Sequence, residues 1–259
     1  MSIFAKKQRI VKRKKLIITI LLIIIITVWW RAPIFINEWN KQTIYVGLYD
    51  VWYGKSKDDK AYAMWIDDDS TIGVFKVKKI ADALNIPSYY AIVANNMEQE
   101  VADSLASWQR QGAGILLHGL SHELWKEWDE AQIEYDIHQS NQRLQEQGFD
   151  TTKVIKMIVP PHGSNTKTIR KVIKRHGCKM ISGATLVNPD RHVFQLGRIS
   201  INPDTDIDFT REVLEKAYKR KAFVIFCTHS SIPESFSVEK TQEILRLTKE
   251  MGFCFDIYE

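Results

Sequence analysis

Residues 61–93 read AYAMWIDDDSTIGVFKVKKIADALNIPSYYAIV, and this stretch decides the fold class. Its two ends, AYAMWI and PSYYAIV, are short apolar runs of the kind that buried strands favour. Between them, residues 75–84 place apolar side chains at the spacing of an amphipathic helix. Strand, helix and strand in this order predict two parallel strands joined by a right-handed crossover.

The same alternation continues to the C-terminus. Six more β-rich runs follow: GILLHG (114–119), KVIKMIVP (153–160), CKMISGA (178–184), HVFQLGRISI (192–201), AFVIFCTH (222–229) and FCFDIY (253–258). Helix-like segments lie between most of them, over residues 98–111, 130–147, 166–176, 208–220 and 237–251. Eight strand candidates favour an irregular (β/α) barrel of seven or eight strands over an open doubly wound sheet. Either fold gathers its chemistry at the carboxyl ends of the strands.

The N-terminal part has the pattern of a membrane anchor. Residues 1–15 form a basic head, and residues 16–30, LIITILLIIIITVWW, contain no charge, Gly or Pro. A cleaved signal peptide has a similar layout, but no small-residue cleavage site follows here. We therefore expect an uncleaved, single-pass signal anchor in the cell membrane, although 15 residues cover only about 22 Å of a roughly 30 Å core.

The distribution of charge orients this anchor and argues against one class of partner. The chain carries net charge +5, but eight basic residues and no acid lie in residues 1–31, which leaves −3 for residues 32–259. The positive-inside rule places the head in the cytoplasm and the later domain outside. A mildly acidic domain does not indicate nucleic-acid binding. Residues 31–60 form a juxtamembrane segment, and residues 61–259 the barrel domain.

The three cysteines argue against a disulfide framework. They are Cys178, Cys227 and Cys254, an odd number with no Cys-x-x-Cys pair. They are typical of small buried apolar residues. The oligomeric state is not indicated by the sequence.

Residues of the kinds that bind metal ions or transfer protons follow four of the predicted strands. They are Asp67-Asp68-Asp69, His118 with His122, Pro160-Pro161-His162-Gly163 and His229. In a barrel, all four groups project into one bowl. Taken singly, each has a plainer interpretation: a triple-Asp turn is typical of a solvated loop or a magnesium site, and one histidine is typical of a satisfied core residue. Their joint placement favours a functional site.

A carboxylate and two histidines form a recurrent zinc set that leaves one position for water. His118 and His122 are four residues apart, so both rings share one face if the chain turns helically after its strand. Asp68 is the predicted third ligand. Asp67, beside it, is then free to accept a proton from the activated water, and His229 is placed to donate one to a leaving group.

These motifs resemble those of the polysaccharide deacetylases of carbohydrate esterase family four. Trp65-Ile66-Asp67-Asp68-Asp69 stands in place of Thr-Phe-Asp-Asp-Gly, and His118 to His122 matches His-Ser/Thr-x-x-His. Val159-Pro160-Pro161-His162-Gly163 is similar to Arg-Pro-Pro-Tyr-Gly, and Phe226-Cys227-Thr228-His229 to Leu-x-x-His. The resemblance covers nearly all of the predicted barrel.

The resemblance implies hydrolysis of N-acetyl groups on the aminosugars of a cell-wall, capsular or exported polysaccharide. It implies that Asp67 is the base and His229 the acid, and that Asp68, His118 and His122 hold a divalent metal, expected to be Zn²⁺. It also implies that a backbone N–H in the Pro161-His162 turn helps to stabilise the oxyanion.

This chain departs from the family pattern at several positions. Val159 replaces the third-motif Arg, for which Arg198 is a candidate substitute, and the fourth motif has no clear counterpart. Trp125 follows the second motif and either stacks on a sugar or packs against the next helix. A degenerate glycan- or partner-binding module and an O-deacetylase therefore stay open as alternatives.

Overall fold

The computed structural model describes residues 56–183 and 187–255. Its strands are β1 (Tyr62–Asp67), β2 (Tyr89–Ile92), β3 (Gly114–Leu117), β4 (Met157–Ile158), β5 (Lys179–Ile181), β6 (Gln195–Leu196), β7 (Ile199–Ser200) and β8 (Phe223–Thr228). Its helices are α3 (Val74–Leu84), α4 (Gln99–Arg110), α5 (Glu130–Glu146), α6 (Lys167–Arg175), α7 (Ile207–Lys219) and α8 (Val238–Glu250). Short 3₁₀ turns lie at η1 (Trp125–Glu127), η2 (Thr151–Lys153), η3 (Pro161–Gly163) and η4 (Pro233–Ser235).

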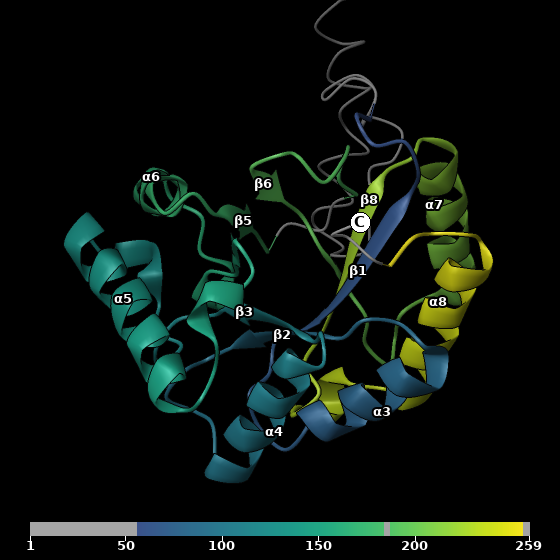
Figure 1. The fold of residues 1–259 in the computed structure, drawn as a ribbon. Coiled ribbons are helices and arrows are strands. Elements are labelled where there is room, and N and C mark those ends of the chain that lie inside the picture. The colour runs from purple at the N-terminus through teal and green to yellow at the C-terminus, as the bar shows by residue number, and fades with distance from the viewer. Residues whose placement is uncertain (1–55, 184–186, 256–259) are drawn as a thin grey trace, which may run out of the picture. The chain divides into compact units, whose positions relative to one another are not determined.

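The strands form one parallel sheet in the order β6-β5-β4-β3-β2-β1-β8-β7. The sheet curls, and the helices lie along its outer side (Figure 1). This arrangement follows from the alternation of strand and helix, because each crossover returns the chain to the same side of a parallel sheet. The predicted (β/α) architecture is confirmed for the described residues.

The extended segment 195–200 connects the two edges of the curled sheet. Its first half, β6, pairs with β5 through Met180 and Gln195, and its second half, β7, pairs with β8 through Ile199 and Phe226. Gly197 and Arg198 separate the two halves. The run predicted as one strand is therefore two short ones, and the break presents Arg198 at the carboxyl end of β6.

All six predicted helices are confirmed, each within one residue of its expected ends. The last predicted strand is reduced, within the described residues, to a single bridge between Cys254 and Tyr62. No helix in residues 56–183 or 187–255 is long and apolar enough to cross a membrane. The basic head, the anchor at residues 16–30 and nearly all of the juxtamembrane segment lie outside the described residues.

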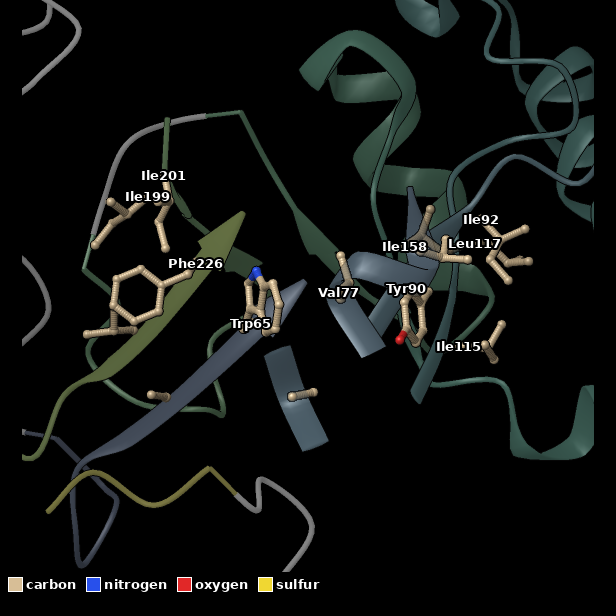
Figure 2. Packing of buried hydrophobic residues seen from close by; sticks show 14 of the residues in the cluster. Trp65, Val77, Tyr90, Ile92, Ile115, Leu117, Ile158, Ile199, Ile201 and Phe226 are labelled. Carbon is tan, nitrogen blue, oxygen red and sulfur yellow. The ribbon is translucent and has the colours of Figure 1, made fainter. Parts of the chain in front are cut away.

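Two apolar clusters cover the two faces of the sheet. One cluster, which includes Met64 and Ile66, contains residues of the strands and none of the helices. It therefore fills the concave side of the sheet. The other joins strands to helices and contains Trp65 and Phe226, which are partners on β1 and β8 (Figure 2). Because side chains alternate along a strand, Asp67 continues the outer face of Trp65, and Asp68 is the next residue on the concave side.

Candidate active site

An open cavity lies at the carboxyl ends of the strands. Its lining includes Asp68, Asp69, His118, His122, His162, Gly163, Arg198 and His229. These residues come from four separate strand ends and from the break between β6 and β7. The predicted gathering of polar residues in one bowl is therefore found, and the chemical role of each residue stays a prediction.

His118 and His122 face each other across the cavity. The His118 Nδ1–H donates to the Val159 carbonyl oxygen at 2.7 Å, so its Nε2 presents a lone pair. The two Nε2 atoms lie 3.2 Å apart. The chain after His118 is irregular rather than helical, and His122 has a left-handed backbone with φ of 58°, yet the two rings lie side by side with centroids 4.8 Å apart.

Both histidines are neutral at pH 7. Burial lowers the pKa of His118 below its usual range. Burial, together with the neighbouring His118 and His162, lowers the pKa of His122 to about 4. A neutral imidazole is the form that binds a metal, so the two rings are held in the state that a ligand needs.

Asp68 is the buried carboxylate of the cavity. Its Oδ2 accepts a hydrogen bond from the Arg198 guanidinium, whereas its Oδ1 is buried and has no hydrogen-bond partner. Burial raises the pKa of Asp68, but Arg198, His118 and His229 more than offset this, so its net pKa lies below the usual value. An ionised carboxylate with one unpartnered oxygen therefore belongs to the cavity lining.

The two histidine nitrogens are spaced as ligands of one divalent metal ion would be, but Asp68, His118 and His122 are not among the described groups whose possible ligand atoms all lie within 4.8 Å of one another. Tetrahedral ligands bonded at about 2.0–2.1 Å lie about 3.3 Å from one another, close to the 3.2 Å that separates the two histidine nitrogens. The His118 Nε2 lies 3.8 Å from Asp68 Oδ2. Asp68, His118 and His122 stay the predicted ligands of such an ion, and the Asp68 carboxylate would have to move toward His122 for all three to bind it.

A second group of possible ligand atoms shares Asp68. Atoms of Asp68, Cys227 and His229 all lie within 4.8 Å of one another. Burial raises the pKa of the Cys227 thiol well above its ordinary value. Because the thiolate is the form that binds metals, this group fits a metal less well than the histidine pair does.

His229 lies at the mouth of the cavity. Its Nε2 is 3.9 Å from Asp68 Oδ2, and its side chain is 37% exposed. The residue follows β8 directly, so the backbone of a central strand fixes where the ring begins. Its ring is accessible to a bound substrate, as a proton donor to a leaving group must be.

Asp67 does not line the cavity. It is completely buried, and its carboxylate accepts hydrogen bonds from Thr228 Oγ1 at 2.7 Å, the Ser230 N–H at 3.1 Å and Ser230 Oγ at 2.6 Å. Burial raises the pKa of Asp67 to about 8, although these hydrogen bonds act to lower it. Asp67 is thus bonded to Thr228 and Ser230 beside the cavity, and its role as the base stays a prediction.

The three remaining predicted residues have different outcomes. Trp125 is completely buried in the outer cluster, which favours packing over stacking on a sugar. Pro161 is also buried; it has no N–H to donate, and it packs over Gly119. His162 lines the cavity and lies against His122: their ring centroids are 4.3 Å apart, and His162 Nε2 lies 3.0 Å from the His122 carbonyl oxygen.

The loop between the two cavity histidines is held by a residue of α5. Asp136 is buried, and its Oδ1 accepts hydrogen bonds from the Leu120 N–H at 2.9 Å and from Ser140 Oγ at 3.3 Å. Asp136→Ala is expected to lower the free energy of unfolding by about 1–3 kcal/mol, because the Leu120 N–H loses its buried acceptor. Urea denaturation measures this loss. Asp136→Asn keeps an acceptor oxygen and should cost less; equal losses in the two variants would contradict the interpretation.

Two residues near the site were given no role from the sequence. Ser230 contacts both Asp67 and Asp69, the latter through its Oγ at 3.0 Å from Asp69 Oδ2. Asp69 lines the cavity and also accepts the Thr71 N–H. The only signal for Ser230 was its position directly after His229, and for Asp69 its place in the acidic triplet.

Comparisons with known proteins agree with this fold. Residues 54–181 match the family model described as polysaccharide deacetylase. A search of curated protein sequences returns no match. The fold is similar to that of the Bc1960 peptidoglycan N-acetylglucosamine deacetylase, at 16% identity and a TM-score of 0.57, with 77% of this chain and 86% of the other covered.

Two further structures of similar fold are those of an esterase and of a pseudoenzyme. One is a family 4 acetyl xylan esterase from Clostridium thermocellum in complex with a cobalt ion, at 16% identity and a TM-score of 0.55, with 74% of this chain and 85% of the other covered. The other is a family pseudoenzyme from Bacillus anthracis, at 12% identity and a TM-score of 0.52, with 77% and 64% covered. At these identities the likeness shows the fold alone.

Proposed function

We propose that this chain, which carries a divergent polysaccharide deacetylase domain, is a membrane-anchored, metal-dependent hydrolase that removes N-acetyl groups from the aminosugars of a cell-wall, capsular or exported polysaccharide. One observation carries the proposal. The cavity brings the buried Asp68 carboxylate together with two neutral histidines whose Nε2 atoms are 3.2 Å apart. That donor set is the one that metal-assisted hydrolysis needs.

A divalent metal, with Zn²⁺ as the expected ion, supplies Lewis-acid polarisation of the acyl oxygen and lowers the pKa of water. The chain's own residues supply the rest. The Val159 carbonyl fixes the tautomer of His118, and Arg198 keeps Asp68 ionised. As water adds to the acyl carbon, it gives up a proton to a base, for which Asp67 is the predicted residue. As the C–N bond breaks, His229 protonates the departing nitrogen, which leaves acetate and a free amine.

The anchor is part of the proposal and rests on the sequence. Residues 16–30 carry no charge, and seven of the eight basic residues in residues 1–31 lie on the N-terminal side of this run. This asymmetry orients the catalytic domain away from the cytoplasm. An extracytoplasmic domain would meet the exported glycan that the proposed reaction requires.

The experiment is to measure acetate release by the full-length protein in membrane and soluble fractions, with N-acetylglucosamine oligomers as substrate. We expect release from the membrane fraction, its loss on chelation and its return when Zn²⁺ is added back. Release that is indifferent to the chelator would overturn the metal-dependent mechanism. Activity in the soluble fraction of a full-length preparation would overturn the anchor.

Two alternatives are separated by further arms of the same assay. Release from acetylated xylan, with none from N-acetylglucosamine oligomers, would identify an O-deacetylase, as the fold of an acetyl xylan esterase allows. Binding to a glycan without release from either substrate would identify a degenerate binding module, as the similar fold of a pseudoenzyme allows.

A further inference from the structure

The loop that leads from His118 to His122 is held along most of its length. Its residues 119–121 form hydrogen bonds of 2.8–3.1 Å with Ala94, Asn95 and Asp136. These bonds fix the start and the middle of the loop, and they stop one residue before His122. The position of His122 itself therefore depends on a separate contact.

His162 makes that contact from the turn that follows β4. Its Nε2 lies 3.0 Å from the His122 carbonyl oxygen. Because a carbonyl oxygen can only accept, the Nε2–H of His162 is the donor. The two rings also lie against each other, with centroids 4.3 Å apart and planes inclined at 46°. His162 thus contacts both the backbone and the ring of His122.

Both histidines have a left-handed backbone, with φ of 58° at His122 and 55° at His162. In a residue other than glycine, such a conformation costs on the order of 1–3 kcal/mol and persists only where the surroundings hold it. The turn that carries His162 is closed by a bond of 3.1 Å from the Gly163 N–H to the Pro160 carbonyl oxygen. A closed turn therefore supports the end of the His122 loop.

We infer that His162 is a positioning residue for His122, and that it fixes the arrangement in which the Nε2 atoms of His118 and His122 lie 3.2 Å apart. The motif that this turn resembles has tyrosine in place of His162. The hydroxyl of a tyrosine is farther from the backbone than the imidazole Nε2, so the bond to His122 belongs to the histidine of this chain. The inference rests on the proposed function, because it assigns support to a predicted metal ligand.

The test measures the Zn²⁺ affinity of the full-length protein in detergent, by competition with a chromogenic chelator. We expect His162→Ala to weaken binding about 10- to 100-fold, as the loss of a residue that orients a metal ligand does. His162→Gln should restore most of this affinity, because its amide nitrogen can donate to the same carbonyl oxygen. His138→Ala removes an exposed histidine of α5 and is the control. It should bind Zn²⁺ as wild type does.

Kinetics at saturating Zn²⁺ separate support of His122 from contact with the substrate. Because His162 acts through the metal ligand, the KM of His162→Ala for N-acetylglucosamine oligomers should equal that of wild type once the site is filled. A raised KM together with an unchanged Zn²⁺ affinity would show that His162 contacts the substrate, and would overturn the inference.

A third readout needs neither metal nor turnover. In the metal-free, full-length protein, the closeness of His118 and His122 is read as a nuclear Overhauser effect between their ring protons, identified by its absence in His122→Gln. Their ring centroids are 4.8 Å apart, which is close enough for the effect to be seen. We expect the effect in wild type and His162→Gln, and a weaker one in His162→Ala.

Each outcome decides the role of His162. Loss of affinity in His162→Ala that His162→Gln restores supports the inference. Equal losses in the two variants would mean that the imidazole itself binds the ion, and wild-type affinity in His162→Ala would mean that His122 needs no support. If wild type binds Zn²⁺ without releasing acetate, the proposed reaction fails and the affinities still decide. If wild type binds no Zn²⁺, the metal dependence fails and the Overhauser effect decides.

Discussion

His118→Ala is expected to lower metal-dependent acetate release by about a thousandfold or more, the largest effect of any single change in the cavity. The lost ligand removes charge stabilisation worth several kcal/mol in the transition state, and each 1.36 kcal/mol is a tenfold change in rate. The loss of this ligand is hard to compensate, because His118 is a buried residue whose ring is held in place by the hydrogen bond from Nδ1 to the Val159 carbonyl oxygen. Acetate release and bound metal per protein, measured on the same preparations, check the expectation.

Cys227→Ala is the matched control for the ligand set. It removes the thiol of the second group of candidate ligand atoms, which shares Asp68 with the histidine pair. We expect this variant to keep its metal, because burial holds the pKa of the thiol high and the thiol stays protonated. Loss of metal in Cys227→Ala with full metal in His118→Ala would transfer the site to Asp68, Cys227 and His229.

The helices were predictable because their signal is local. Periodic apolar residues mark both the buried face and the ends of each helix, and all six formed within one residue of expectation. The break at Gly197 and Arg198 was not predictable in the same way. It depends on segment 195–200 pairing with β5 on one edge and β8 on the other, and partners so distant in sequence leave no local pattern.

The sequence predicted which residues line the cavity better than it predicted where their side chains lie. Strand ends identified Asp68, His118, His122 and His229, because parallel strands bring their carboxyl ends together. The face on which Asp67 lies was hidden, since β1 is buried on both sides and its residues show no alternation of polar and apolar types. The position of Trp125 was hidden for a similar reason, because the sequence does not state whether an aromatic residue after a motif lies on the rim or in the core.

The sequence offered Arg198 only as a candidate substitute for the third-motif Arg. In the structure, Arg198 is the positive charge that pairs with Asp68. Asp68 and Arg198 have side chains only 1% and 10% exposed, so the pair is desolvated. Arg198→Met is expected to lower the free energy of unfolding of the metal-free protein by about 3–5 kcal/mol, because it leaves a buried carboxylate without its counterion. Urea denaturation of the metal-free variant and wild type measures the difference.

The stability lost in Arg198→Met should depend on pH. In wild type, Arg198 helps to hold the pKa of Asp68 below its usual value. Without Arg198, burial dominates and raises that pKa, so the folded variant prefers a protonated Asp68. A group with a raised folded pKa stabilises at low pH and loses that contribution as pH rises. The deficit of Arg198→Met should therefore be smaller at low pH than at neutral pH.

Zinc provides the second arm of this experiment. A divalent ion held by Asp68, His118 and His122 would neutralise the same carboxylate, so Zn²⁺ should stabilise Arg198→Met more than it stabilises wild type, where the guanidinium already pairs with Asp68. Arg198→Lys keeps a positive charge and should lose less stability than Arg198→Met does. Equal stabilisation of wild type and Arg198→Met by Zn²⁺ would show that the ion does not reach Asp68.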